Sequence, residues 1–325
     1  MTLEIYIWPA QWGLPSSEPI SLALILYLQL KMSSQFVLVE SVNLDKSPSG
    51  QLPFLRNGKD TVAPLSSILS YLGDEVSTST SIMPWLAHAE SNLGDLVLQN
   101  KLHMFYSLHA NWTELTHPSI VYRFPIPQRY YVPRAIRDSY KLRLDAAGLW
   151  SMSMPETEQE KERTFSERSK GETEVKPKPR DRFLQVFERE KMKVLDKART
   201  TLDLYSRLLG ERDYFLNGHH PSLLDCVVAA HVLLLSRPPF RDPLLKDLVN
   251  TSYSSLVAHA DRLYARAQLS DNMIKPARIE VPDAFLGLGD SGEGSDVWLT
   301  RCRFAFAGLT LGGLLAYSYG ALPSN

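Results

Sequence analysis

The chain has 325 residues, enough to bury one large core or two smaller ones. Hydrophobic residues make up 44% of it and aromatic residues 10%, which excludes a chain that is disordered throughout. The formal charge of -1 gives no general attraction to nucleic acid, so we expect no nucleic-acid partner. Only Cys226 and Cys302 are present, far apart, which excludes a Cys-x-x-Cys redox pair and fits a reducing compartment.

The first seventy-five residues alternate between strand and helix signals. Residues 3–8 form a strand candidate, and residues 16–30 a helix opened by a serine cap with Pro19 in its first turn. A second strand candidate follows at 36–42, then a hairpin about "RNGK" and a helix that ends on Gly73. The order predicts a thioredoxin-like domain over 1–75, with Pro53 in the cis form before a strand. The opening residues lack a basic stretch followed by an apolar one, so we expect no secretory or transit peptide.

From Met83 the spacing of apolar residues becomes helical, which predicts an all-helical domain over 83–269. Residues 155–182 interrupt it with acidic and basic side chains and almost nothing apolar, so this insertion cannot form a core. We interpret it as a disordered segment or a solvated helix. A passive loop is one role for it, and regulation or docking is the other.

The last part of the chain contains an apolar run, 304–322, without a formal charge. As a helix it reaches roughly 28 Å, near the hydrocarbon thickness of a bilayer. Arg301 and Arg303 precede the run and Trp298 precedes them, as on a cytoplasmic flank with an interfacial aromatic. We therefore predict a transmembrane helix over 304–322, with a flexible tether at 283–297 before it. The alternative is a buried C-terminal helix of a soluble domain.

Small residues recur at every fourth position of that run. They are Gly308, Gly312, Ala316 and Gly320. On a helix they form one stripe along which another membrane element can approach closely. The stripe predicts a partner inside the membrane.

Two stretches resemble a known fold family. Residues 214–235, "YFLNGHHPSLLDCVVAAHVLLL", resemble the motif of glutathione transferase C-terminal domains, in which Gly218 precedes a capping box of Ser222 and Asp225. Together with the thioredoxin-like first part, this implies a glutathione-transferase-like fold, an α/β N-terminal domain followed by an all-α C-terminal domain. The resemblance covers nearly everything from Met1 to Leu269.

The second resemblance is narrower. Trp12, Gly13, Leu14 and Pro15 are similar to the "WGLPS" opening of the metaxin family, transferase-like proteins of the mitochondrial outer membrane. With a C-terminal anchor, the chain resembles the fungal metaxin-like subunit of the sorting and assembly machinery. The resemblance implies a non-catalytic scaffold on the cytosolic face of the mitochondrial outer membrane, supporting insertion and release of β-barrel precursors.

The same resemblance implies the partners. They are the central outer-membrane barrel protein, a second transferase-like subunit, β-barrel precursors and the outer-membrane preprotein translocase. Two other functions stay open: a membrane-anchored glutathione-transferase-like enzyme and a tail-anchored import receptor. Co-purification with a barrel protein separates the scaffold from the enzyme.

Several residues bear on the enzyme alternative. Alignment with the transferases puts Pro64 and Leu65 where an acidic residue and a serine hold the charged end of glutathione. Without those groups the ligand's carboxylate and amine would lie desolvated and unpaired. Tyr6 is the one candidate for thiolate stabilisation, with Ser16 and Ser17 weaker ones, and Tyr6 on a central strand is better explained as a packed aromatic. We therefore expect no catalysis.

The histidines do not indicate a metal site. His219 and His220 are adjacent, and His103 and His109 are six apart, so neither pair places two imidazoles on one helical face. We expect no metal and no cofactor.

A basic set follows a stiff aromatic loop, "RFPIPQRYYVP". Arg134, Arg137 and Lys141 are spaced by three and four residues and would share a helical face. They could contact an acidic receptor segment or lipid headgroups, or form an ordinary solvated face.

Overall fold

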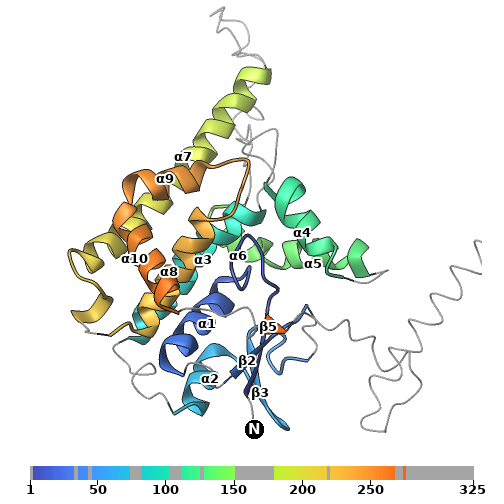
Figure 1. The fold of residues 1–325 in the computed structure, drawn as a ribbon. Helices are drawn as coiled ribbons and strands as arrows, with labels where there is room; N and C mark the ends of the chain where they lie inside the picture. Colours follow the sequence, from blue (N-terminus) through green and yellow to red (C-terminus); the bar gives the residue numbers. More distant parts are fainter. Residues whose placement is uncertain are drawn as a thin grey trace, which may run out of the picture. The chain divides into compact units, whose positions relative to one another are not determined.

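The computed structural model describes most of the chain between residues 3 and 275 (Figure 1). The described residues are 3–32, 36–42, 46–73, 82–102, 111–124, 128–150, 179–217, 220–267 and 274–275. All of them belong to one compact unit, Met1–Ala277. The predicted tether, the predicted transmembrane run and most of the charged insertion lie outside the described residues, as do Gly218 and Cys302.

A mixed sheet forms the first layer, and its strand order is β4-β3-β1-β2-β5. Its strands are β1 (Leu3–Ile7), β2 (Phe36–Glu40), β3 (Phe54–Asn57), β4 (Asp60–Val62) and β5 (Ile274–Lys275). β1 pairs in parallel with β2 and antiparallel with β3, and β3 pairs antiparallel with β4. The β3–β4 hairpin turns at Gly58, whose φ of 64° suits glycine, so the predicted turn is confirmed.

The fifth strand was not predicted. β5 follows the helical part in sequence and returns to pair in parallel with β2, with Leu38 opposite Ile274 (Figure 1). It lies beyond the all-helical domain predicted over 83–269, so that prediction did not cover it. A segment of two residues is too short to show the alternation that predicts a strand. These residues form a strand only because they pair with the edge of β2.

Two helices belong to the α/β part: α1 (Pro19–Lys31) and α2 (Leu65–Tyr71). The predicted serine cap of α1 is wrong, because the N-cap is Glu18, whose carboxylate accepts a hydrogen bond from the Ser21 N–H at 2.6 Å. Ser16 accepts from the Glu18 N–H instead. α2 ends as predicted, with Gly73 at a φ of 74° just beyond it.

The second layer is helical. Its elements are α3 (Met83–Leu102), η1 (Trp112–Thr116), α4 (His117–Val121), η2 (Gln128–Tyr130), α5 (Val132–Ser139), α6 (Lys141–Ala146), α7 (Pro179–Leu209), η5 (Phe215–Asn217), α8 (Leu223–Ser236), α9 (Leu244–Ser252) and α10 (Ser254–Ala267). α8 contacts α1, α3, α9 and α10, so it is the central helix of the unit. An α/β N-terminal region followed by a helical region is the predicted glutathione-transferase-like order.

None of the helices in the described part of the chain combines the length and the apolar character that crossing a membrane requires.

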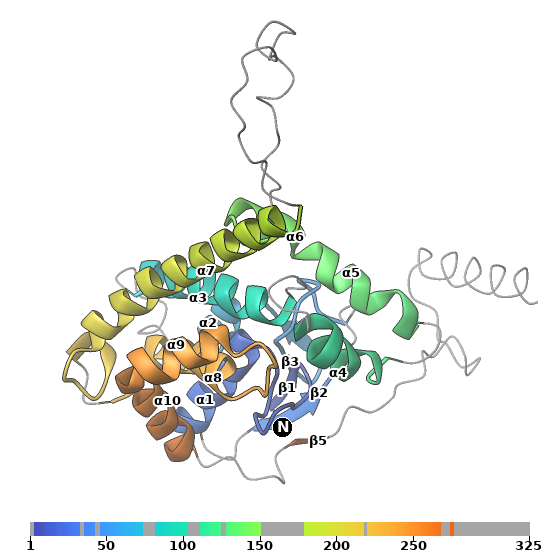
Figure 2. The same cartoon turned by 90° about the horizontal axis from the view of Figure 1, so that it is seen from above.

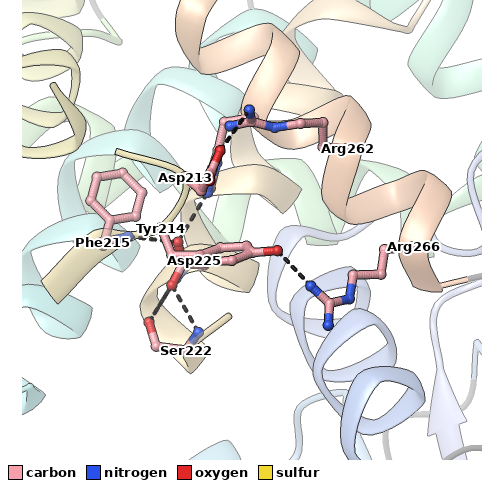
Figure 3. Close-up of polar contacts among 8 residues, drawn as sticks. Asp213, Tyr214, Phe215, Ser222, Asp225, Arg262 and Arg266 are labelled. Atoms are coloured by element: carbon pink, nitrogen blue, oxygen red, sulfur yellow. Dashed lines mark hydrogen bonds and ion pairs between the residues drawn. The ribbon is translucent and has the colours of Figure 1, made fainter. Parts of the chain in front are cut away.

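The start of α8 is buried and needs internal partners for its free N–H groups. The expected capping box is present: the Asp225 N–H donates to the Ser222 hydroxyl, and the Asp225 carboxylate accepts from the Ser222 N–H at 2.8 Å. Figure 3 shows the same carboxylate accepting from the Phe215 N–H, at 2.9 Å. His259 of α10 also contacts it at 2.9 Å. Asp225 therefore joins the preceding turn, α8 and α10.

Replacing Asp225 tests this junction. Asp225→Ala leaves several buried donors without an acceptor, so we expect the free energy of unfolding to fall by about 3 kcal/mol or more. Ser222→Ala removes one cap and should cost only about 1 kcal/mol. Urea unfolding of the two variants measures the difference. Equal losses would mean that Asp225 acts only as part of the helix cap.

Candidate functional site

The site to test is the place where a transferase of this fold would hold glutathione: the end of β1, the start of α1, the cis-proline strand and the start of α2. The first loop here makes a two-residue reverse turn. Trp12 and Gly13 have φ of 55° and 73°, and the backbones of Gln11 and Leu14 exchange hydrogen bonds of 3.0 and 2.9 Å. Positive φ at both central residues is the geometry of a type I′ turn, which glycine favours at the second position.

This turn is attached to the helical part. The Trp12 ring lies 5.7 Å from the Phe240 ring, and the Lys101 ammonium lies 5.6 Å from the Trp12 ring centroid. The Gly13 carbonyl accepts a hydrogen bond of 3.1 Å from the Tyr264 hydroxyl of α10. The predicted family motif therefore connects the first loop to residues of α3, α10 and the segment between α8 and α9.

The N-terminus of α1 is filled by the chain itself. The Glu18 carboxylate caps it, and Lys101, at the end of α3, donates a hydrogen bond to the Ser17 carbonyl just before it. Ser16 is fully buried, and its hydroxyl accepts from the Glu18 N–H at 3.3 Å. A helix N-terminus attracts anions, and here an internal carboxylate takes that position.

Burial shifts the protonation of both charged groups. It raises the pKa of the Glu18 carboxyl above its ordinary value, although the Ser21 hydrogen bonds and the Lys101 charge act in the opposite direction. It lowers the pKa of Lys101 to about 8, against the opposing attraction of Glu18. Desolvation outweighs the pairing in both cases, so the pair fills this space without a large electrostatic gain.

Tyr6, the candidate for thiolate stabilisation, is packed against neighbouring side chains. Its ring stacks on that of Phe54 at 4.4 Å, and its hydroxyl donates to the Glu4 carboxylate at 3.2 Å. The side chain is buried on a central strand. These contacts match the expectation of a packed aromatic with a satisfied hydroxyl.

The cis-proline strand and the start of α2 complete the site. The Leu52–Pro53 peptide is cis, as expected, and the Ala63–Pro64 peptide is cis as well. Pro64 is the N-cap of α2 and makes no side-chain hydrogen bond there, and Leu65 is buried in the core. At the two positions aligned with the ligand-binding pair of the transferases, this chain presents no charged or hydrogen-bonding side chain.

The basic set does not form one face. Arg137 turns inward, where its guanidinium lies 4.4 Å from the Trp150 ring and its Nε donates to the Leu102 carbonyl at 3.3 Å. Arg134 is exposed on α5, and Lys141 is exposed at the start of α6, after the helix breaks at Tyr140. The expected common face is therefore wrong for Arg137, because the two tryptophans beside it, Trp150 and Trp112, offer it aromatic partners.

Of the four histidines considered for a metal, only His220 lies among the described residues, and it is exposed. Sequence reasoning missed Glu18 and Lys101. Glu18 could have been found, because an acidic residue directly before a first-turn proline is a helix-start signal. Lys101 carried no such signal, since only the contact between α3 and the first loop buries it.

Comparisons with known proteins bear on the whole chain. Residues 21–137 match the family described as "Outer mitochondrial membrane transport complex protein", and residues 198–263 match "Glutathione S-transferase, C-terminal domain". Metaxin-1 of Mus musculus is 26% identical over 240 residues, 72% of this chain and 65% of that protein. Metaxin-3 of Xenopus laevis is 27% identical over 238 residues, 70% of this chain and 64% of that protein. The chain is therefore similar to the metaxins over 70–72% of its length.

The chain spans somewhat less than two thirds of those relatives' length. Among solved structures, apo glutathione S-transferase III overlaps 83% of this chain and 99% of its own, with 17% identity and a TM-score of 0.39. A glutathione transferase of Phanerochaete chrysosporium overlaps 83% and 100%, with 14% identity and a TM-score of 0.44. The glutathione-transferase-like fold rests on the order of elements and on the C-terminal domain match.

The buried ammonium of Lys101 predicts that the free energy of unfolding depends on pH. Between about pH 8 and the ordinary value of 10.5, folded Lys101 has lost its proton while the unfolded chain keeps it. The unfolded state then binds more protons, so the free energy of unfolding rises with pH, by on the order of 2 to 3 kcal/mol. Lys101→Met should lack this rise. Urea unfolding across that range measures it, with Lys59→Met on the exposed hairpin as the control; parallel curves for all three proteins would contradict the burial of the charge.

Proposed function

We propose that this metaxin-like chain is a non-catalytic subunit of an outer mitochondrial membrane transport complex, the sorting and assembly machinery. In this function it supports the insertion and release of β-barrel precursors on the cytosolic face. Its partners would be the central barrel protein and a second transferase-like subunit, with the preprotein translocase as a further contact. The mechanism is positional and uses protein contacts alone.

The observation that carries the non-catalytic part is the filled start of α1. The Glu18 carboxylate holds the helix N-terminus, and Lys101 covers the preceding carbonyl. A bound thiolate would need that helix end and would meet a carboxylate there. The apolar start of α2 adds to this, because the charged end of a tripeptide would find no partner at Pro64 or Leu65.

The proposed membership in a transport complex is supported by the family match over residues 21–137 and by the metaxin relatives. We propose that the apolar run 304–322 attaches the chain to the membrane. The stripe of Gly308, Gly312, Ala316 and Gly320 would contact a membrane-embedded partner.

Affinity purification after mild detergent extraction tests the proposal. We expect an outer-membrane β-barrel protein to co-purify with the chain. We also expect no retention on glutathione resin and no heat of binding in calorimetry at about 1 mM glutathione. A monomeric chain that binds the resin and conjugates a thiol would overturn the proposal in favour of an enzyme. A chain that co-purifies only with import receptors would overturn the assembly role.

A bulky residue in the stripe tests the membrane contact. Gly312→Leu should block close helix approach and lower the yield of the co-purified barrel protein several-fold. Gly312→Ala keeps a small side chain and is the matched control. Thermal unfolding of the extramembrane part should be the same in both. An unchanged yield with Gly312→Leu would remove the stripe from the proposal.

A further inference from the structure

A second surface stands out, on the segment from the end of α4 through α6. The four most exposed large hydrophobic side chains of the described residues all lie here: Leu142 at 82%, Tyr122 at 79%, Tyr130 at 74% and Tyr131 at 55%. Figure 2 shows α4 and α5 together on the side of the unit away from α10. Large apolar groups exposed along one segment indicate a binding face.

The exposed positions follow helical spacing. Tyr131, Arg134, Ala135 and Asp138 are all exposed, at steps of three and four, and Lys141 and Leu142 continue the series after the break at Tyr140. Pro133 and Leu144 do not belong to this series, and both are buried. We call the six exposed residues, with Tyr130, the outer face of α5 and α6.

Arg137 holds the opposite side in place. Its guanidinium packs on Trp150, and its Nε donates to the last carbonyl of α3, that of Leu102. Arg143 of α6 donates to the Asp95 carboxylate of α3 at 2.7 Å. These inner contacts fix both short helices to α3, so the outer face is presented by a supported structure.

The charge of this segment differs from that of the rest. Residues 122–146 contain six Lys and Arg and two Asp, a formal charge of +4 in a chain whose total is -1. Three of the basic residues are used internally or across to neighbouring elements: Arg137, Arg143 and Arg123, which lies 3.7 Å from Glu40. Of the other three, Arg129 belongs to η2, and Arg134 and Lys141 lie on the outer face, where Arg134 is 3.9 Å from Asp138.

We propose that the outer face of α5 and α6 binds the surface of an anionic phospholipid membrane. Tyrosines place an apolar ring and a polar hydroxyl at the headgroup level, and the basic side chains attract anionic headgroups. The face carries Arg134 and Lys141 with one acidic residue, Asp138, within a segment of formal charge +4, and an anionic membrane surface complements that charge. This contact is additional to the proposed C-terminal attachment, and it would orient the unit against the membrane.

The test uses the full chain reconstituted into vesicles, with a local reporter that the C-terminal segment does not affect. A polarity-sensitive fluorophore is placed at Ala135→Cys, on the outer face, in a Cys302→Ser background; Cys226 is buried and stays. In vesicles of phosphatidylcholine with about 20% phosphatidylserine we expect a blue shift of the emission and quenching by nitroxide-labelled lipid. Pure phosphatidylcholine should give neither, and about 0.5 M salt should reverse both.

Variants separate the proposed contact from general membrane proximity. Arg134→Glu with Lys141→Glu should reduce the size of the response at about 20% phosphatidylserine at least about tenfold. Arg207→Glu with Arg212→Glu changes the charge equally at the far end of α7 and should leave the response intact. Tyr130→Ser with Tyr131→Ser should reduce quenching while keeping the salt dependence. A fluorophore at Thr200→Cys on α7 should not respond.

Other outcomes would contradict the membrane proposal. A response of equal size in neutral vesicles, or one that survives both charge reversals, would overturn the proposal. If vesicles give no response and soluble polyglutamate shifts the emission instead, the face binds an acidic protein segment and the lipid assignment is wrong. Unchanged thermal unfolding of the charge-reversal variant shows that it folds. Co-purification of the barrel protein is measured separately, so failure of this surface and failure of the proposed function are distinguishable.

Discussion

The unit depends on the packing of α1 against α8. Both helices are apolar on nearly all sides, and α8 also contacts α3, α9 and α10. Two helices buried in this way must begin inside the protein, where water cannot satisfy their first N–H groups. Each start is therefore closed by a carboxylate, Glu18 on α1 and Asp225 on α8. Hydrophobic burial requires these polar caps, because an unpaired donor at either start would offset much of the gain.

The two caps have different consequences. Asp225 also accepts from the Phe215 N–H and contacts His259, so it stabilises only the interior of the helical part. Glu18 caps the start of α1, and its carboxylate makes that helix end unsuitable for another anion. The same residue thus stabilises α1 and occupies the helix end that an anionic ligand would need. The helix can therefore keep its place in the fold without a bound anion, because the Glu18 carboxylate supplies the negative charge at its start.

Local signals predicted the elements that their own residues determine. The Ser222–Asp225 box, the turn at Gly58 and the end of α2 at Gly73 each depend on a few neighbouring side chains, and the structure contains all three. Features that depend on distant contacts were not predictable. β5 exists because β2 has a free edge, and Lys101 is buried because α3 ends beside the first loop. The local sequence does not distinguish Arg137 from Arg134, and contacts with Trp150, Trp112 and the Leu102 carbonyl hold Arg137 on the inner side.

The family motif itself has a structural explanation. Trp12 and Gly13 form the centre of a tight turn, and both are held by the helical part, Trp12 through Phe240 and Lys101 and Gly13 through Tyr264. The turn therefore fixes the angle at which the sheet meets the helices, next to the capped start of α1. The contacts of this turn with Lys101 of α3 and Tyr264 of α10 show that these residues join the first loop to the helical layer, so the motif has a structural role whatever else it does.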